Sequence, residues 1–352
     1  MKIFGWTHSK LGNGSLHYRV HSPLVEVARQ GLGDVVIGPN IDAENVADAD
    51  VLVAHGLSNS QRFDQLAERA DWLRDRVFVY EHDDDYLNVR ADNPIFSLGA
   101  YDYDEYMAEV RPRVIQHLQM ADLITVSVPH LASVYREHTD APIVVLPNAI
   151  DAVLLEVAQP LRQPGEQLRV GWAGSGSHIL DWRACADGIR YGLAKTGAHM
   201  VMMGADFRTM LRYRDTEYLP WADAMDAYYL PMTTWHVALA PLVDEVWNRS
   251  KSPLKALEAA SFGIPVVAGD AEPYRDFIVH GETGFLCRTD DDWMRALRAL
   301  GQDEEMRQEM GRKGREIAGR FTIQEWAAEW VGTYQRAVDA HRGSRLVVNS
   351  AS

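Results

Sequence analysis

Residues 247–267 read WNRSKSPLKALEAASFGIPVV and predict a short helix that ends at a corner and continues into a buried strand. Ser252 and Pro253 are typical of a helix start, because a serine oxygen can cap free backbone amides and proline suits the first helical turn. The Gly-Ile-Pro corner at 263–265 ends the helix and leads into two valines. A helix that feeds directly into an apolar strand is a repeating unit of α/β folds.

Three cations lie at the predicted start of this helix: Arg249, Lys251 and Lys255. A helix N-terminus already attracts anions through its free N–H groups and its dipole, so the added charge suits a diphosphate. Glu258 follows Lys255 by three residues on the same helix face, where its carboxylate can accept hydrogen bonds from sugar hydroxyls. The alternative interpretation is an ordinary amphipathic helix with a solvated Lys255–Glu258 pair.

Apolar runs alternate with helical segments on both sides of this stretch, which predicts parallel sheets. We expect an N-terminal Rossmann-like lobe at 1–158, a linker at 159–167 with two prolines and a glycine, and a second such lobe at 168–322. Ligands of doubly wound sheets bind beyond the carboxyl ends of the strands, so an interdomain cleft is the expected site. The predicted strands are 2–6, 34–38, 51–55, 77–81, 123–128 and 143–147, then 168–173, 199–203, 235–240, 265–268 and 284–287.

The length and charge of the chain limit what it can do. Its 352 residues exceed the usual size of one domain. The net charge is −15, and residues 1–160 carry 24 acidic against 12 basic side chains, which disfavours broad nucleic-acid binding. Two cysteines, Cys185 and Cys287, indicate a reducing, cytoplasmic compartment. We expect no transmembrane segment, because no apolar run is long enough.

A final amphipathic helix is predicted at 323–341. Trp326, Trp330, Tyr334 and Val338 recur every fourth residue and form an apolar face that must be buried. We expect this helix to pack across the two lobes. Residues 343–352 lack periodicity and are expected to form a disordered tail.

The run from 248 to 267, continued by Glu272 and by HGETGFL at 280–286, resembles the C-terminal lobe of retaining GT-B glycosyltransferases. These are also described as glycosyltransferase family 4-like, or glycosyl transferases group 1. GNG at 12–14, LPNAID at 146–151 and VGWAGS at 170–175 extend the resemblance over most of the chain. The resemblance implies a GT-B fold and transfer of a sugar from a nucleotide-diphosphate sugar with retention, usually without a metal.

The resemblance also implies roles for single residues. Arg249, Lys255 and Glu258 become the expected catalytic residues, with Glu258 orienting the ribose of the donor. Two departures stand out: Ser250 replaces a usual carboxylate, and GSGSH at 174–178 lacks a frequent Arg and Lys. For the aromatic members of the donor-binding group, core packing is the alternative interpretation. That expected group is Gly12, Gly14, Gly174, Ser175, Tyr218, Trp221, Lys251 and Ser252.

Five residues of the first lobe are expected on the acceptor side: His8, His17, Arg19, Asp83 and Asp84. The first three flank the glycine loop at 12–14, whose amides can approach a phosphate, although a plain strand-to-helix turn explains that loop equally well. By residue type, each of these three is more often a surface residue.

Asp83, Asp84 and Asp85 follow a predicted strand. Crowded carboxylates are tolerated in solvent, near a cation or around substrate hydroxyls, so a magnesium site is the alternative to an acceptor-side or structural role. The resemblance argues against a required metal.

Two other functions are weighed against a glycosyltransferase. A nucleotide-sugar 2-epimerase shares the architecture but needs no acceptor, and a noncatalytic nucleotide-sugar-binding protein would suit the missing carboxylate at position 250. A dehydrogenase is disfavoured, because no Gly-x-Gly-x-x-Gly follows the first strand. The base, the sugar and the acceptor, whether protein, glycan, lipid, nucleobase or small molecule, stay open.

Overall fold

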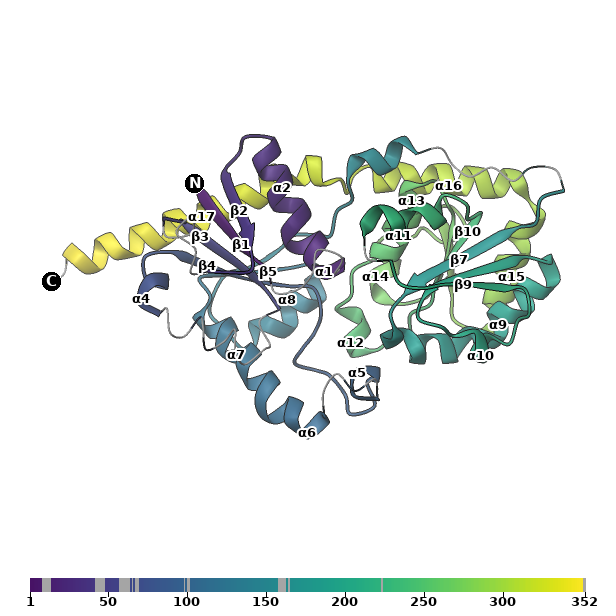
Figure 1. Cartoon of the computed structure of the whole chain (residues 1–352), viewed down its shortest axis with the longest axis horizontal. Coiled ribbons are helices and arrows are strands. Elements are labelled where there is room, and N and C mark those ends of the chain that lie inside the picture. Colours follow the sequence, from purple (N-terminus) through teal and green to yellow (C-terminus); the bar gives the residue numbers. More distant parts are fainter. Residues whose placement is uncertain are drawn as a thin grey trace. The chain divides into compact units, whose positions relative to one another are not determined.

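The computed structural model describes residues 1–352 except 8–13, 42–47, 57–63, 65, 67–69, 98, 100–101, 158–162, 164, 223 and 351–352. The chain divides into two compact units, each with its own sheet (Figure 1). The first unit comprises Met1–Val89, Tyr101–Ala149 and Ile323–Ser352, and the second comprises Arg90–Ala100 and Ile150–Thr322.

The first unit contains a six-stranded parallel sheet in the order β2-β1-β3-β4-β5-β6. Its central strands are mostly apolar because helices cover both faces, and every residue of β3 and β4 is buried, including the polar residues at their carboxyl ends. The predicted strands of this half are all present, with ends that differ by at most two residues. They are β1 Lys2–Trp6, β2 Asp34–Gly38, β3 Val51–His55, β4 Val77–His82, β5 Leu123–Val126 and β6 Ile143–Val145.

Side chains alternate between two cores on opposite faces of this sheet. Leu24 of α2 and Trp330 of α17 pack on one face, while Leu118 of α7 and Tyr135 of α8 pack on the other (Figure 1). The helices of this unit are α1 Gly14–Leu16, α2 Ser22–Arg29, α4 Ala70–Leu73, α6 Tyr103–Glu105, α7 Arg111–Met120, α8 Pro129–Arg136 and α17 Ile323–Ser350, with π-helical turns at His17–His21 and Tyr106–Val110.

The second unit contains another six-stranded parallel sheet, in the order β12-β11-β10-β7-β8-β9. The α/β class with two doubly wound parallel sheets is thus confirmed. The sequence misses edge strand β9, because Thr-Glu-Tyr-Leu carries a charge and is only half buried. The strands are β7 Arg169–Gly174, β8 His199–Gly204, β9 Thr216–Leu219, β10 Val237–Ala240, β11 Val266–Gly269 and β12 Gly284–Cys287.

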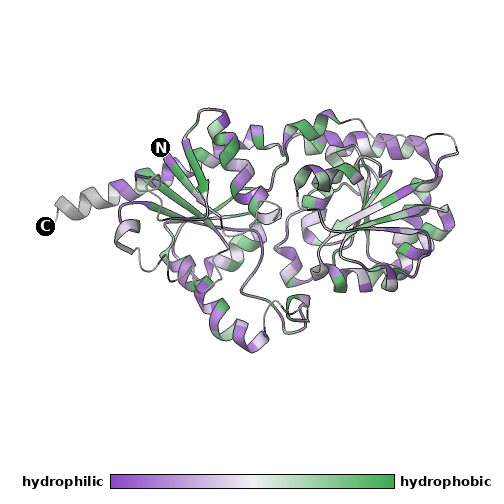
Figure 2. Cartoon of the chain, viewed as in Figure 1, coloured by the Kyte–Doolittle hydropathy of each residue, from purple (hydrophilic) through white to green (hydrophobic). Residues whose placement is uncertain are grey.

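Two cores again lie on opposite faces of the sheet. Leu257 of α13 and Met232 of α11 belong to one core, and Trp182 of α9 and Leu297 of α15 belong to the other. Figure 2 shows apolar strands at the centre of each unit and polar residues on the helices around them. The helices are α5 Pro94–Ser97, α9 Ile179–Thr196, α10 Arg208–Leu211, α11 Met225–Met232, α12 Val246–Arg249, α13 Leu254–Ser261, α14 Glu272–Arg275, α15 Asp290–Gln302 and α16 Glu304–Ala318, with 3-10 turns at Ala152–Glu156 and Gly176–His178.

The borders of the units differ from those expected from composition. The chain enters the second unit at Ile150 rather than near the proline-containing stretch at 159–167, and Ile150 pairs with Thr322 in an isolated parallel bridge. Residues 90–100 also belong to the second unit, where α5 contacts the 3-10 turn Gly176–His178. A segment from the first half of the sequence therefore lies next to the glycine-rich turn after β7.

Helix α17 follows the predicted apolar periodicity. Trp330, Tyr334 and Val338 are buried in the core of the first unit, and Trp326 packs against it. The helix continues to Ser350, whereas the sequence predicts that it ends near residue 341 and is followed by a tail. None of the described helices combines the length and the apolar character that a membrane span needs.

Candidate functional site

Helix α13 is the helix predicted from residues 247–267, but it starts differently from the prediction. Its N-cap position is Pro253, one residue after the predicted Ser252, and the proline makes no side-chain capping bond. The physical reason is that the first turn closes on the proline: Ala256 N and Leu257 N both donate to Pro253 O at 2.9 Å. Ser252 lies in the turn between α12 and α13.

Lys255 lies in the first turn of α13 and reaches the carboxyl end of strand β7. Its Nζ donates to Ala173 O at 2.9 Å, next to Gly174 and Ser175. Burial lowers the pKa of Lys255 below its usual value, while Glu258 opposes this shift. An ammonium group that is partly removed from water interacts more strongly with an arriving anion.

The other two predicted cations are held differently. Arg249 Nε lies 2.9 Å from Asp244 Oδ1 and 3.8 Å from Glu272 Oε2, so two carboxylates compensate its charge. Lys251 Nζ lies 3.8 Å from the centroid of the Trp247 ring, in a cation–π contact. Lys255 is therefore the predicted cation that contacts the sheet end directly.

Glu258 points into the interior of the second unit. It is 3% exposed, and Tyr228 Oη donates to its Oε2 at 3.0 Å. Burial and the nearby Glu258 carboxylate raise the pKa of the Tyr228 phenol well above its usual value. The solvated Lys255–Glu258 surface pair is thus not what the structure shows, and the ribose role of Glu258 stays a prediction.

A buried aspartate joins the turn after β7 to the segment before α12, and sequence reasoning misses it. Asp181 Oδ2 lies 2.7 Å from His178 Nδ1. Its Oδ1 accepts from Val243 N at 2.9 Å and from Asn248 Nδ2 at 3.0 Å. A His-x-x-Asp spacing directly after a glycine-rich turn is the signal that could have identified this pair, because residues three apart face each other at a helix start.

Ser250, which replaces the usual carboxylate, is fully buried. Its Oγ has no hydrogen-bond partner among the described residues, and neither has Oδ1 of the nearby Asn248. A charged carboxylate in such a place would be costly without a partner. The serine at this position is consistent with its buried surroundings.

The predicted donor-binding aromatics lie at the carboxyl ends of β8 and β9. Tyr218 Oη donates to Gly204 O at 2.9 Å. Trp221 is 45% exposed and its ring covers Gly204, where an added Cβ would lie 2.6 Å from the indole. Trp221 is therefore not a core residue, while Tyr228 is. Gly204 pairs in register with Gly174, so these aromatics share one sheet end with Lys255.

Of the first-lobe loop residues, Gly14 and His17 are described, whereas His8 and Gly12 lie outside the described residues. Gly14 begins α1, and no atom lies within 4 Å of a Cβ added there. The rings of His17 and His21 stack with centroids 6.0 Å apart. The loop is thus followed by a helix, as its sequence predicts.

Arg19 is completely buried, so the expectation of a surface residue is wrong. Its Nε donates to Glu81 Oε1 at 2.7 Å, and its Nη1 donates to Leu146 O at 2.6 Å and to Asn148 Oδ1 at 2.9 Å. The guanidinium carbon lies 5.0 Å from the centroid of the Trp330 ring. Within the core, Arg19 therefore connects β4 to the segment that ends the N-terminal part of the first unit. The general tendency of arginine to be exposed does not predict this contact.

The acidic run after β4 is used within the protein. Asp83 Oδ1 lies 3.1 Å from His55 Nε2, and this hydrogen bond holds the pKa of Asp83 below its usual value against the effect of burial. Asp84 O accepts from Tyr135 Oη at 2.8 Å. Asp85 accepts from Leu87 N at 2.9 Å and from the Asn88 amide at 2.8 Å.

The carboxylates of Asp83 and Asp85 are not arranged as ligands of one magnesium ion. Asp85 is turned toward backbone and amide donors and Asp83 toward an imidazole, whereas magnesium needs oxygen ligands directed to one point. Over the described ranges, no three His, Cys, Asp or Glu side chains are grouped as metal ligands.

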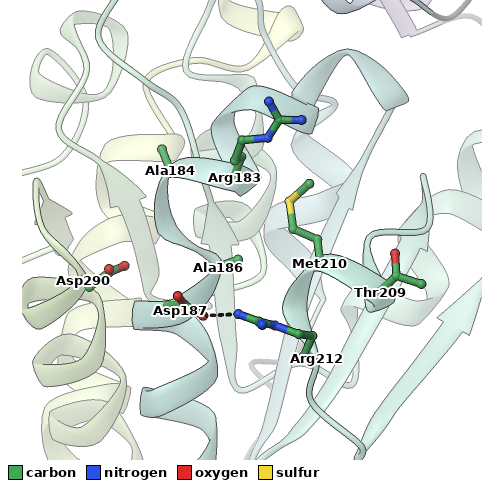
Figure 3. Close-up of a pocket in the computed structure, with 8 residues that line it drawn as sticks. All are labelled: Arg183, Ala184, Ala186, Asp187, Thr209, Met210, Arg212 and Asp290. Atoms are coloured by element: carbon green, nitrogen blue, oxygen red, sulfur yellow. Dashed lines mark hydrogen bonds and ion pairs between the residues drawn. The ribbon is translucent and has the colours of Figure 1, made fainter.

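A separate pocket of about 350 Å³ lies beside α9 (Figure 3). Figure 3 shows Arg212 directed toward Asp187, and Arg212 Nη2 lies 3.0 Å from Asp187 Oδ1. The left-handed backbone of Arg212 is explained by its place at the end of α10. The pocket contains no predicted site residue, and one of its two arginines, Arg212, is paired with Asp187. It is lined by Arg183, Ala184, Ala186, Asp187, Thr209, Met210, Arg212 and Asp290.

The segment that contains α13 is similar to a known protein family. Residues 247–317 match the family described as glycosyl transferases group 1. An uncharacterized glycosyltransferase from Haemophilus influenzae is 31% identical over 83 residues, which are 23% of this chain. This chain spans about 24% of the length of that relative.

Solved structures show the same fold along most of the chain. Sucrose-phosphate synthase from Thermosynechococcus elongatus superposes with a TM-score of 0.66 at 14% identity, covering 97% of this chain and 99% of that one. HepE from Anabaena, in complex with UDP and glucose, gives 0.62 at 16% identity, covering 95% and 100%. The pneumococcal O-GlcNAc transferase GtfA, in complex with UDP and GlcNAc, gives 0.54 at 16% identity, covering 82% and 57%.

Proposed function

Because residues 247–317 match glycosyl transferases group 1 and the two parallel sheets form the GT-B fold, we propose that this chain is a retaining glycosyltransferase. It moves a sugar from a nucleotide-diphosphate sugar to an acceptor that stays open between protein, glycan, lipid and small molecule. The observation that carries the proposal is the Lys255 ammonium at the carboxyl end of β7, inside the matched segment and against Ala173 O.

The donor diphosphate is assigned to the end of β7 for electrostatic reasons. When the sugar leaves, negative charge grows on the diphosphate, and fixed cations and amides near it stabilise the transition state more than the bound donor. Lys255 supplies a cation there, and Gly174 and Ser175 supply a turn whose backbone can approach a phosphate. Lys251 adds positive charge on the same segment, whereas the charge of Arg249 is compensated by Asp244 and Glu272.

We propose a uridine nucleotide as the donor base. HepE and GtfA are described in complexes with UDP, and these structures share the fold. In this chain, the exposed Trp221 ring next to Tyr218 offers a flat apolar surface for a base. Because Ser250 replaces the usual carboxylate, the identity of the donor sugar is not assigned. For retention, we propose that the leaving phosphate itself helps to deprotonate the acceptor, because no side chain stands out as general base.

A panel of UDP-, GDP-, ADP- and dTDP-sugars in a thermal-shift assay tests the donor proposal. A ligand that binds only the folded state raises the melting temperature, so we expect UDP-sugars to raise it most. The stabilising donor is then incubated alone and with acceptor pools. Transfer only in the presence of an acceptor supports the proposal. An isomeric sugar nucleotide from donor alone identifies an epimerase, and binding without transfer or hydrolysis identifies a noncatalytic binding protein.

We propose that turnover needs no metal ion, since Asp83 and Asp85 are directed at protein donors. Adding EDTA to the transfer assay is therefore expected to leave the rate unchanged. A complete loss of turnover that magnesium restores would contradict this proposal. Dialysis against EDTA followed by magnesium titration provides the matched control.

We also propose a cytoplasmic location. Cys185 and Cys287 are both free thiols buried in one core of the second unit. Unpaired cysteines are typical of reducing compartments, where thiols stay reduced. Localising a tagged full-length chain by fractionation would test this.

A further inference from the structure

His178 and Asp181 form a buried pair at the sheet end that the proposed function uses. His178 closes the 3-10 turn after β7, and Asp181 lies in the first turn of α9. Their side chains are 9% and 4% exposed, and Nδ1 lies 2.7 Å from Oδ2. Asp181 is also fixed by Val243 N and Asn248 Nδ2, so the orientation of the imidazole is set by three elements. The carboxylate accepts the Nδ1–H, which leaves Nε2 as the second functional atom of the ring.

Nε2 of His178 is available for a ligand. It has no hydrogen-bond partner among the described residues, although nine-tenths of the side chain is buried. The ring lies against the end of β7. A Cβ added to Gly174, the last residue of that strand, would lie only 3.2 Å from His178 Cδ2. The same strand end holds Lys255 through Ala173 O.

The charged groups around His178 oppose one another. Burial and the cations Lys255 and Lys251 lower the pKa of His178 to about 4, while Asp181 acts in the raising direction. Helix α5, which packs against the same turn, contributes no charged side chain over Pro94–Ser97. The imidazole of the free protein is therefore neutral at neutral pH. An anion bound near the lysines and the ring would raise the pKa of His178, because its negative charge favours the imidazolium form over the neutral imidazole.

We propose that His178, oriented by Asp181, is a further donor-binding residue that takes up a proton when a nucleoside diphosphate sugar binds and then donates from Nε2 to a phosphate oxygen. The proton comes from an acid in the solvent, whose bond to it breaks, and it forms an N–H bond at Nε2, while no bond of the nucleotide sugar changes. This inference rests on the proposed function, because it assigns the diphosphate to the end of β7. It adds an imidazole to a site whose other cations are lysines.

The proposal has a defined pH dependence. Donor binding raises the pKa of His178. At a pH between the pKa of the free protein and the pKa of the complex, the bound state therefore holds more protons than the free protein. Donor affinity must then be highest at low pH and fall as the pH rises through the pKa of the complex. Lysines with ordinary pKa values and backbone amides alone would bind a diphosphate diester with nearly constant affinity over this range, because neither titrates there.

The test is isothermal titration calorimetry of the full chain with UDP-glucose in two buffers of different ionisation heat. The diphosphate diester of this probe has no group that titrates near neutral pH, so proton uptake belongs to the protein. At about pH 6 we expect uptake approaching one proton per ligand in the natural sequence. We expect His178→Gln to take up almost none and to bind about tenfold more weakly.

His199 provides the matched control. It pairs with Asp215 through the same kind of contact, Nδ1 to Oδ1 at 2.7 Å, but it lies at the amino end of β8. His199→Gln is expected to keep both affinity and proton uptake. The uptake measurement on the unaltered chain needs no variant, so the test holds even if His178→Gln fails to fold.

The outcomes separate this inference from the proposed function. Proton uptake that disappears only in His178→Gln supports it. Binding of UDP-glucose with no uptake, or with uptake that survives in His178→Gln, overturns the role of His178 and leaves the proposed donor site standing. Absence of binding by any nucleotide sugar of the panel overturns the proposed function and this inference together.

Discussion

Lys255→Ala is expected to lower the turnover number of sugar transfer about a hundredfold, which is the scale for removing one preorganised donor to a developing anion. The reason is geometric: Nζ lies at the end of β7, 2.9 Å from Ala173 O, where the proposed diphosphate leaves. In the transition state the ammonium faces more negative charge than in the donor complex. The loss should therefore appear in kcat more than in KM.

Steady-state kinetics with a saturating acceptor measures this effect. Lys313→Ala is the matched control, because Lys313 is a solvent-accessible lysine on α16 whose ion pair is with Glu309 of the same helix. Lys255→Arg tests whether charge alone suffices. If the alanine variant is folded by circular dichroism and turns over at the normal rate, Lys255 has no part in the reaction.

Arg19→Met is expected to destabilise the first unit by about 3–5 kcal/mol, the usual cost of leaving one partner of a buried ion pair uncompensated. Glu81 is fully buried and holds Arg19 Nε at 2.7 Å, with Thr125 Oγ1 as a further donor. Burial already raises the pKa of Glu81 above its usual value, and Arg19 opposes that shift. Without the guanidinium, the carboxylate has no cation to compensate its desolvation.

The stability lost in Arg19→Met depends on pH, because it depends on the charge of Glu81. Removing Arg19 raises the pKa of Glu81 further, so the penalty is largest where Glu81 is ionised and shrinks as the pH falls below the folded-state pKa. The free energy of unfolding is measured in urea, with hydrogen exchange of the β3 and β4 amides reporting on the first unit. The variant should be closer in stability to the natural sequence at about pH 5 than at about pH 7.5.

Two variants make the interpretation specific. Replacing both Arg19 and Glu81 with methionine should recover much of the stability, because an apolar pair of similar volume needs no charge compensation. Arg312→Met removes a solvent-exposed pair with Glu309 and should leave unfolding nearly unchanged. A single Arg19→Met variant as stable as the natural sequence would show that the buried pair contributes nothing.

The local patterns of the sequence explain why so much of the architecture is predictable. The first four residues of β3, Val-Leu-Val-Ala, are all apolar because both faces of the strand are covered, and this pattern is visible without the partner strands. The glycine-proline corner after α13 likewise marks its own helix end. The edge strand β9 escapes prediction because half of it faces solvent, and its composition carries little signal.

The candidate site is predictable in kind but not in geometry. The cations near α13 are visible in the sequence, yet only the structure shows that Arg249 is compensated by Asp244 while Lys255 lies against Ala173 O. Glu258 looks like a surface residue in the helix pattern and is instead buried against Tyr228. Charge, spacing and helix periodicity do not say which neighbouring element covers a given face.

By itself, the sequence determined two parallel sheets, the α12–α13 segment with its cations and the apolar face of α17. These depend on residues close together along the chain. The tertiary structure alone decided which distant groups meet: Arg19 with Glu81, 62 positions apart, Asp181 with Asn248, 67 apart, and Lys255 with Ala173, 82 apart. The physical reason is that such contacts depend on how whole elements pack, and burial then selects the ionic and hydrogen-bond partners that compensate desolvation.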